Sequence, residues 1–342
     1  MNAGDMNLSV VMSVYNEEKF VNKAISSILD QTFPDFELII VDDGSTDNTP
    51  QIIESFAKRD NRIRFLRNAQ NKGKSESLNV AISLSKGEII ALMDGDDISL
   101  PERLEKQLDF LKRNPEVGLV GVKYWEIDED DSVVNRVIYP RKLRGRSLKR
   151  MLYKRNFFAG GSLMFRKSLF EKVGGFNVHF VVSEDFDFIL RVGEISKIAI
   201  VDEVLYLHRL KPSSISFRAG KLMKEFHLLA IKASKIRESD GDDKTYVARQ
   251  SRRILERYGL PSNKSLNRAR QDVCYTLNFK ARMALRKGNH RKARETALKS
   301  FKQCRNLSAL RLIIISFLPH RFYNLILEIR DILKVWALGT LR

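Results

Sequence analysis

Cysteine and long hydrophobic runs are scarce in this chain, and both shortages narrow the classes of protein it can belong to. Two cysteines in 342 residues, Cys274 and Cys304, are too few for a disulfide framework, and their spacing matches no metal-binding knuckle. This suits a reducing compartment. The first apolar stretch, Leu8–Val14, has neither a basic flank nor a small-residue cleavage site, which argues against a signal peptide. The later stretch Leu307–Leu318 contains Arg311 and is too short to span a bilayer, so we expect a cytoplasmic protein without a transmembrane helix.

Acidic residues are scarce in the last third of the chain. Residues 1–210 hold 30 lysines and arginines against 32 acids, a net charge of −2, whereas residues 211–342 hold 30 against 10, a net charge of +20. The break lies near Lys211-Pro212-Ser213-Ser214, so we predict one domain over residues 1–215 and a basic region over 216–342. A solvated helical face explains such charge, and so does peripheral contact with anionic lipid. Nucleic-acid binding is disfavoured, because no RNA- or DNA-reading motif accompanies the charge.

Apolar runs alternate with amphipathic stretches through the first 210 residues. The runs lack polar alternation and are rich in β-branched residues, which indicates buried strands. The predicted strands are Leu8–Val14, Phe36–Val41, Ile63–Leu66, Glu88–Met93, Gly118–Ile127, Ser132–Tyr139, one within Gly160–Phe165 and one beginning at Ile198–Val201. The predicted helices are 17–31 with Asn16 as its cap, 49–59, 75–85, 101–112, 184–194 and, from about Arg218, a largely helical remainder. This order predicts an α/β fold with a mostly parallel central sheet, helices on both of its faces, and a basic α-helical C-terminal region.

Two of these predicted strands end in clustered carboxylates. Asp42-Asp43-Gly44-Ser45-Thr46-Asp47 follows the second strand, and Asp94-Gly95-Asp96-Asp97 follows the fourth. Open α/β sheets bind ligands in the crevice at the carboxyl ends of their strands. Clustered aspartates repel one another unless a cation holds them, and oxygen ligands favour Mg²⁺ or Mn²⁺, which in turn attract phosphate. The sequence therefore predicts a metal- and nucleotide-binding site.

The order of five short motifs carries a resemblance to a known family. They are Ser9–Glu18, Asp42–Asp47, Asp94-Gly95-Asp96, Gly174-Gly175-Phe176 and Ser183-Glu184-Asp185-Phe186-Asp187. Together they resemble the family 2 glycosyltransferases with the GT-A fold over roughly residues 7–215. The resemblance implies a Rossmann-like domain that transfers a sugar, with inversion, from a nucleoside diphosphate donor, typically UDP-linked. A glycan or lipid-linked hydroxyl would accept the sugar during the synthesis of a surface or envelope glycan.

The resemblance also assigns roles to particular positions. The nucleotide-sugar site would contain Ser13, Tyr15 and Glu17 beside the nucleotide, Asp43 on the base, Lys74 on the diphosphate, Asp94 near the ribose, and Asp96. Asp96 would hold the Mn²⁺ or Mg²⁺ ion that stabilises the leaving nucleoside diphosphate, and His208 would reach the metal or the diphosphate. Asp185 would be the general base for the acceptor hydroxyl. One base without a second carboxylate nucleophile is what a single inverting displacement requires.

Two departures and two rival interpretations remain. The Gln-x-x-Arg-Trp motif of the family's processive synthases is absent, which favours a non-processive enzyme, and Ser13-Val14 replaces the usual proline before Tyr15-Asn16. An inactive GT-A scaffold that binds partners through its helical rear is one rival. A sugar-phosphate nucleotidyltransferase is the other, but it needs a Gly-rich basic loop where Val14-Tyr15-Asn16-Glu17 stands. Structural interpretations also exist for single residues, since Asp42, Asp47, Asp97 and Asp185 all suit helix caps.

Overall fold

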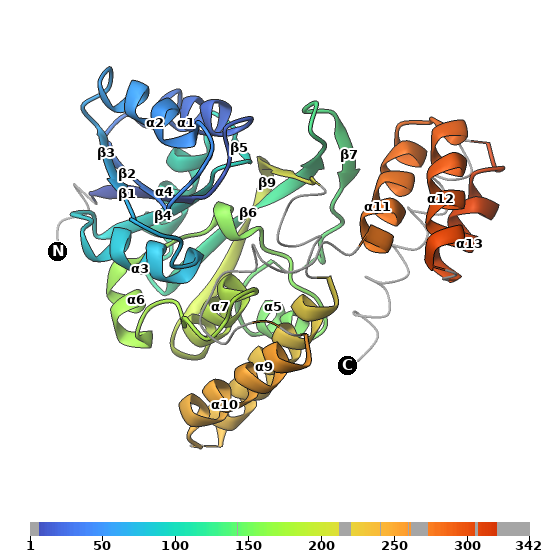
Figure 1. Ribbon diagram of the computed structural model, residues 1–342. Coiled ribbons are helices and arrows are strands. Elements are labelled where there is room, and N and C mark those ends of the chain that lie inside the picture. Colours follow the sequence, from blue (N-terminus) through green and yellow to red (C-terminus); the bar gives the residue numbers. More distant parts are fainter. Residues whose placement is uncertain are drawn as a thin grey trace. The chain divides into compact units, whose positions relative to one another are not determined.

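The computed structural model describes residues 7–141, 143–211, 220–239, 241–258, 260, 273–304 and 307–319 (Figure 1). The chain divides into two compact units, and each is described by itself. The first unit comprises residues 1–124, 141–208 and 221–267, and the second comprises 125–140, 209–220 and 268–342. The predicted boundary after residue 215 lies outside the described residues, so it stays a prediction.

The described strands join in one mixed sheet. Their order is β3-β2-β1-β4-β8-β6-β9-β5, and β7 pairs with β6. The strands are β1 (Leu8–Val14), β2 (Phe36–Asp42), β3 (Ile63–Arg67), β4 (Ile89–Asp94), β5 (Ile98–Ser99), β6 (Val117–Ile127), β7 (Val133–Arg136), β8 (Met164–Arg166) and β9 (Lys197–Arg209). The predicted α/β class is confirmed, and the long early strands match their predicted ranges within a residue or two.

The strands β3, β2, β1 and β4 form a parallel group, as their apolar composition predicts. In this group Ser13 of β1 lies between Val41 of β2 and Asp94 of β4. The carboxyl ends of β1, β2 and β4 therefore reach the same edge of the sheet, and each is followed by a polar loop. The neighbours β8 and β4, and also β8 and β6, run antiparallel.

Both units contain helices, and those of the first unit cover both faces of the parallel group. The helices are α1 (Val21–Leu29), α2 (Thr49–Ala57), α3 (Lys74–Ser83), α4 (Arg103–Arg113), α5 (Gly145–Leu152), α6 (Lys167–Val173), α7 (Glu184–Ile195), α9 (Gly220–Glu238), α10 (Asp243–Arg257), α11 (Val273–Arg286), α12 (His290–Cys304) and α13 (Leu307–Ile315). The buried faces of α1, α2 and α4 pack in one apolar cluster with Val10, Leu38 and Ala91 of the sheet. Figure 1 shows α3 on the side of the strands opposite α1 and α2.

Two features of this arrangement differ from the sequence-based expectations, and a third, the extent of the last strand, completes one of them. The first helix begins at Val21 rather than at residue 17, and Asn16 does not cap it. Instead Asn16 has a left-handed backbone (φ 53°), which asparagine tolerates better than most residues. The helices α5 and α6 and the two-residue strand β5 were not predicted, because such short elements carry little periodicity. The last strand, β9, runs on to Arg209 and therefore carries Tyr206 and His208.

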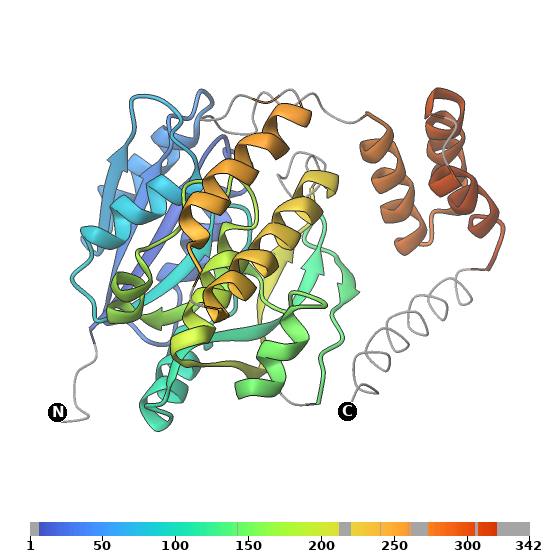
Figure 2. The same cartoon turned by 90° about the horizontal axis from the view of Figure 1, so that it is seen from below.

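The helices α9 and α10 form an antiparallel pair in the first unit (Figure 2). Ion pairs tie both ends of this pair, since Arg237 contacts Asp243 at 2.5 Å and Arg257 contacts Glu225 at 2.7 Å. This pair belongs to the compact unit that also contains the parallel strands.

The second unit contains the turn between β6 and β7 and the helices α11 to α13. An acidic turn is held here by basic side chains: Lys287 contacts Asp128 (2.5 Å) and Asp130 (2.9 Å), and the buried Arg209 contacts Asp131 (2.6 Å). The helices α11 and α12 pack against each other around small buried alanines. None of the described helices is both long and apolar enough to cross a membrane.

Candidate active site

The loop after β1 is joined to the segment after β2 by hydrogen bonds between backbone N–H groups and side-chain oxygens. The Asn16 N–H donates to Ser45 Oγ (2.9 Å), and its side-chain Oδ1 accepts from the Thr46 N–H (2.9 Å). The Glu17 N–H donates to Thr49 Oγ1 (2.8 Å). These bonds explain the left-handed Asn16, and they place Tyr15 and Glu17 at the edge where the parallel strands end.

The first aspartate cluster (Asp42–Asp47) is largely occupied by the protein's own backbone. Asp47 accepts hydrogen bonds from the N–H groups of Thr49 (3.0 Å) and Glu18 (3.2 Å), so it contacts the start of α2, but the N-cap residue of this helix is Asn48 rather than Asp47. The buried Asp42 accepts from the Ser45 N–H and pairs with Arg67 at 3.2 Å. Burial raises the pKa of Asp42, against the lowering effects of Ser45 and Arg67.

Asp43 organises the segment that leads into α3. Its carboxylate is only 2% exposed. One oxygen, Oδ1, accepts from Asn68 Nδ2 (2.8 Å), the Lys72 N–H (2.9 Å) and Ser77 Oγ (2.9 Å), while Oδ2 accepts from the Gly73 N–H (2.8 Å). A carboxylate oxygen has two lone pairs, so the remaining acceptor capacity of Asp43 is on Oδ2.

The second aspartate cluster (Asp94–Asp97) is joined to distant elements by side chains. Lys74, the first residue of α3, places its ammonium 2.6 Å from Asp94 Oδ1 at the end of β4 and 3.7 Å from Glu184 Oε1 on α7. Burial acts to lower the pKa of Lys74, but the charges of Asp94 and Glu184 outweigh it and raise the pKa. Burial raises the pKa of Glu184 to about 7, with Lys74 opposing this and Asp185 adding to it.

A glycine turn fits between Asp94 and Asp185. The turn Gly160–Ser162 precedes β8. A Cβ at Gly160 would lie 2.9 Å from Asp185 Oδ2, and a Cβ at Gly161 would lie 2.7 Å from the Asp94 nitrogen and 3.0 Å from its Cγ. Because any side chain there would collide with these aspartates, the two glycines allow Asp94 and Asp185 to approach the same stretch of backbone.

A buried layer lies beneath this turn. The fully buried Arg103 donates from Nη1 to the carbonyl oxygens of Leu92 and Gly161, both at 3.1 Å, and from Nε to Ser99 Oγ at 2.7 Å. Tyr206 Oη donates to Asp97 Oδ2 at 2.7 Å. Burial lowers the pKa of Arg103 to about 10, within the range where it stays protonated at neutral pH. Asp97 therefore accepts a hydrogen bond within this buried layer, and it does not cap the next helix, α4, whose N-cap residue is Glu102.

The start of α7 is held by three contacts. Ser183, not Asp185, is the N-cap residue, with a left-handed backbone (φ 61°). Its Oγ lies 2.8 Å from Nδ1 of His227, whose ring stacks on Phe186 with the ring centres 4.4 Å apart. One turn further along, the buried Asp187 pairs with Arg191 at 2.7 Å. This leaves the half-buried Asp185 at the first turn, beside the glycine turn.

Arg191 connects α7 to the Gly174-Gly175-Phe176 motif. It donates to the Gly175 carbonyl at 2.7 Å. Asn79 of α3 exchanges two hydrogen bonds with Phe176, at 2.8 and 2.9 Å. The motif is thus a structural link between the helices that carry Lys74 and Asp185.

The remaining predicted site residues lie on the same elements. Ser13 is half-buried at the end of β1, with Tyr15 and Glu17 in the loop that follows it. Gly95 packs against Glu17, because a Cβ there would lie 3.5 Å from Glu17 Cγ. Asp96 is half-buried in the second cluster, and His208 lies on β9 with its ring edge-to-face to Tyr124, centre to centre 5.8 Å.

The donor set after β4 fits a hard divalent cation. Within the described part of the chain, no three histidine, cysteine, aspartate or glutamate side chains gather as a metal site. Mg²⁺, however, is commonly held by one or two carboxylates together with substrate phosphates and water. Carboxylate oxygens such as that of Asp96 suit this mode of binding, in which a bound donor completes the coordination.

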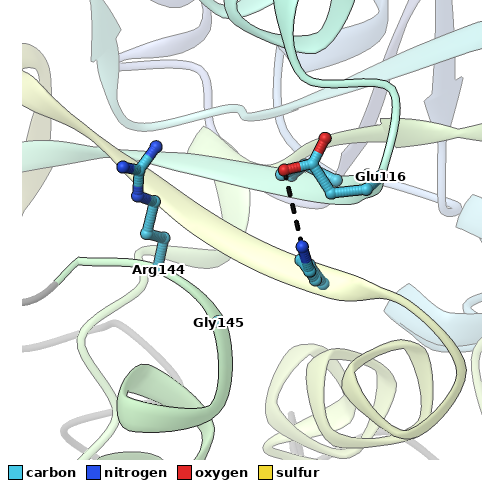
Figure 3. Close-up of a pocket in the computed structure, with 5 residues that line it drawn as sticks. Glu116, Arg144 and Gly145 are labelled. Carbon is cyan, nitrogen blue, oxygen red and sulfur yellow. Dashed lines mark ion pairs between the residues drawn. The ribbon is translucent and has the colours of Figure 1, made fainter.

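A pocket of about 360 Å³ lies elsewhere, between Glu116, Val117, Arg144, Gly145 and Lys197 (Figure 3). Lys197 pairs with Glu116 there at 3.7 Å. Its charges are mixed and it contains none of the predicted site residues. It therefore adds nothing to the site at the strand ends.

Comparison with known proteins agrees with this geometry. The Glycosyl transferase family 2 model matches residues 9–174. The O-antigen biosynthesis glycosyltransferase WbnJ of Escherichia coli is 36% identical over 190 residues, which cover 54% of this chain and 71% of that protein. The chain belongs to glycosyltransferase family 2. It is therefore a glycosyltransferase, and the family predicted from its motifs is confirmed.

Solved structures extend the similarity to the fold. TarS residues 1–349 of S. aureus, in complex with UDP, superimpose with a TM-score of 0.55 at 18% identity, covering 91% of this chain and 89% of that one. The mannosyltransferase PcManGT of Pyrobaculum calidifontis, in complex with GDP-Man and Mn²⁺, gives a TM-score of 0.50 at 16% identity, covering 99% and 87%. These similarities confirm the predicted GT-A fold of this family 2 member.

Several residues of the site were not predicted from the sequence. Glu184 stood beside the predicted base, but its burial and its contact with Lys74 depend on the fold. Arg103, Tyr206 and His227 come from elements far apart in the chain. Only the adjacent acids Glu184-Asp185 carried a signal that could have suggested a second functional carboxylate.

Proposed function

We propose that this glycosyltransferase moves a sugar from a nucleoside diphosphate donor, with UDP as the expected nucleotide, to a hydroxyl of a glycan or lipid-linked acceptor. The transfer is non-processive and inverting, depends on a divalent cation, and serves the synthesis of a surface polysaccharide or glycoconjugate. The basic C-terminal helices would bring it to an anionic membrane surface. The supporting observation is the convergence of Asp94, Lys74 and Asp185 around one glycine turn.

Each proposed residue has one task in the transfer. Asp185 takes the proton of the acceptor hydroxyl while that oxygen attacks the anomeric carbon. The bond from this carbon to the diphosphate oxygen breaks, and its electron pair leaves with the nucleoside diphosphate. Asp96 and His208 are the residues proposed to hold the cation, which supplies Lewis-acid stabilisation of the leaving group when bound.

Lys74 supplies a fixed positive charge on the same side of the site. Without donor it neutralises Asp94 and Glu184. Donor phosphates offer it a stronger, doubly charged partner, so donor binding would draw Lys74 away from at least one carboxylate. Ser13, Tyr15, Glu17 and Asp43 remain the proposed contacts of the nucleotide, and Asp94 that of the ribose.

Thermal unfolding with nucleotides tests the donor site. UDP, GDP and dTDP are each added with and without Mn²⁺. A ligand that binds only the folded state stabilises it by about 2.7 kcal/mol at a hundred times its dissociation constant. We expect a shift with UDP that requires Mn²⁺. A shift with GDP or dTDP instead of UDP would mean that the donor carries that nucleotide. No shift with any nucleotide would support the alternative of an inactive scaffold.

An Asp185→Asn variant separates catalysis from binding. The change keeps the shape of the side chain and removes its basicity, so turnover should fall by about 10²- to 10⁴-fold. The nucleotide-induced shift should stay that of the unaltered protein. Full turnover in this variant would show that Asp185 is not the base.

A further inference from the structure

The helix α13 and the turn that follows it are apolar on two opposite sides. One side, with Ala309 and Leu312, is buried, and α13 contacts α11 and α12. The other side presents large apolar side chains to solvent, namely Leu310, Ile314, Phe317 and Leu318. Of these, Ile314 is 60% and Phe317 64% exposed. Leu310 and Ile314 are four residues apart and lie on one side of α13, and Phe317 and Leu318 follow in the turn after the helix; we call these four exposed side chains the apolar stripe.

The exposed stripe lies in a strongly basic part of the chain. Residues 273–319 contain 11 lysines and arginines and a single acid, Glu295. The basic side chains exposed on α12 and α13 are Arg291, Lys292, Lys299, Lys302 and Arg311. The guanidinium of Arg294 lies 3.7 Å from the centre of the Phe317 ring, so a positive charge directly adjoins the apolar stripe.

A combination of apolar and basic side chains selects the kind of partner. A second copy of this chain would bring a like-charged surface against this one, which opposes self-association. An interfacial helix, in contrast, pairs an apolar side with lysines and arginines that meet anionic headgroups. The stripe is also too short for a helix that spans a bilayer.

We propose that α13 lies in the plane of an anionic membrane surface. Leu310, Ile314, Phe317 and Leu318 enter the boundary between headgroups and acyl chains, while the exposed lysines and arginines of α12 contact the headgroup phosphates. This inference rests on the membrane contact proposed above and names the segment that makes it; it uses residues of the second unit alone, so its test is independent of the sugar donor.

Vesicle flotation of the full chain tests the proposal. Vesicles contain phosphatidylcholine alone or phosphatidylcholine mixed with phosphatidylglycerol. We expect the protein to float with the mixed vesicles only, and to bind them less at high salt, because headgroup attraction is screened. Absence of binding to the mixed vesicles at low salt, or equal binding to both kinds, would overturn the proposal.

Two variants separate the apolar from the electrostatic contribution. The double substitution Ile314→Ser with Phe317→Ser should lower the vesicle partition coefficient by about a hundredfold, since two large side chains no longer leave water. The matched control is Val178→Ser in the first unit, where the side chain is 54% exposed and binding should not change. The double substitution Lys299→Glu with Lys302→Glu leaves the apolar stripe intact. It should lower the vesicle partition coefficient by about tenfold or more, because two attractive charges become repulsive.

The outcomes of these variants decide the question. Circular dichroism and thermal melting establish whether each variant is folded. If the Ile314→Ser, Phe317→Ser variant does not fold, the Lys299→Glu, Lys302→Glu variant alone tests the proposal. Binding that survives both double substitutions would overturn the proposal. So would a chain that dimerises through Ile314 and Phe317 in solution, because the stripe would then be a protein interface.

Discussion

The two aspartate clusters are alike in sequence and unlike in structure. Both follow a buried parallel strand, but Asp42, Asp43 and Asp47 each accept hydrogen bonds from backbone N–H groups, to which Arg67 adds at Asp42, and Asn68 and Ser77 add at Asp43. Asp94 and Asp97 are instead met by side chains, the ammonium of Lys74 and the hydroxyl of Tyr206. Backbone donors are fixed in place, whereas a lysine side chain can exchange one anion for another. The first cluster therefore holds loops together, and we expect the second cluster to exchange its Lys74 contact when a donor binds.

The largest contrast should come from Asp96→Ala in the second cluster. We expect turnover to fall by about a hundredfold or more, because this carboxylate is proposed to hold the cation that stabilises the leaving group. Chelation of divalent metal from the unaltered protein should cause a loss of similar size. The measurement is the initial rate of nucleotide release with and without added Mn²⁺. A variant that retains full Mn²⁺-stimulated activity would remove Asp96 from the metal site.

For Asp43→Ala in the first cluster we expect a large loss of stability beside the loss of the proposed contact with the nucleotide. The substitution leaves the N–H groups of Lys72 and Gly73 without their acceptor inside the protein, so the free energy of unfolding should fall by about 3 kcal/mol. Urea titration of Asp43→Ala and Asp96→Ala compares the clusters directly, and we expect the larger loss in Asp43→Ala because this carboxylate accepts bonds from Asn68, Lys72, Gly73 and Ser77. Equal losses in the free energy of unfolding of Asp43→Ala and Asp96→Ala would contradict the proposed difference between the clusters.

This contrast also shows where sequence reasoning succeeds. The parallel strands were predicted nearly to the residue, because a run such as Phe36–Val41 has no polar face and is bounded by turn residues. The site's location at the strand ends follows from that topology. The predicted beginning of α1 was wrong because Asn16 makes a hydrogen bond with Ser45. That residue lies 29 positions away in the sequence, so no local pattern contains the contact.

Contacts across long separations account for what the sequence did not predict in the site. Tyr206 reaches Asp97 across 109 residues, and His227 reaches Ser183 across 44. Burial of Glu184 depends on the packing of α7, which helical periodicity alone does not reveal. Lys74 was predicted to meet phosphate, and the structure adds Asp94 and Glu184 as its ion-pair partners.

A pH titration tests the electrostatics around the second cluster. Burial raises the pKa of Glu184 from 4.5 to about 7, so its protonated form is favoured by folding. The stability it contributes is present below pH 4.5 and is lost as the pH rises through about 7. Relative to Glu184→Gln, the unaltered protein should therefore lose up to about 3 kcal/mol across this window. Parallel stability curves for the two proteins would contradict the raised pKa.

The smallest expected effect concerns the support of Asp185 rather than either cluster. His227→Ala removes the ring that contacts Ser183 and Phe186, and should cost about 1 kcal/mol of stability. Because Ser183 caps the helix that begins with Glu184 and Asp185, we expect turnover to fall several-fold while donor affinity stays constant. His227→Asn, which keeps a polar group near Ser183, should restore part of the turnover. Loss of donor affinity in step with turnover would mean that His227 supports the whole fold, and that α9 has no specific part in positioning the base.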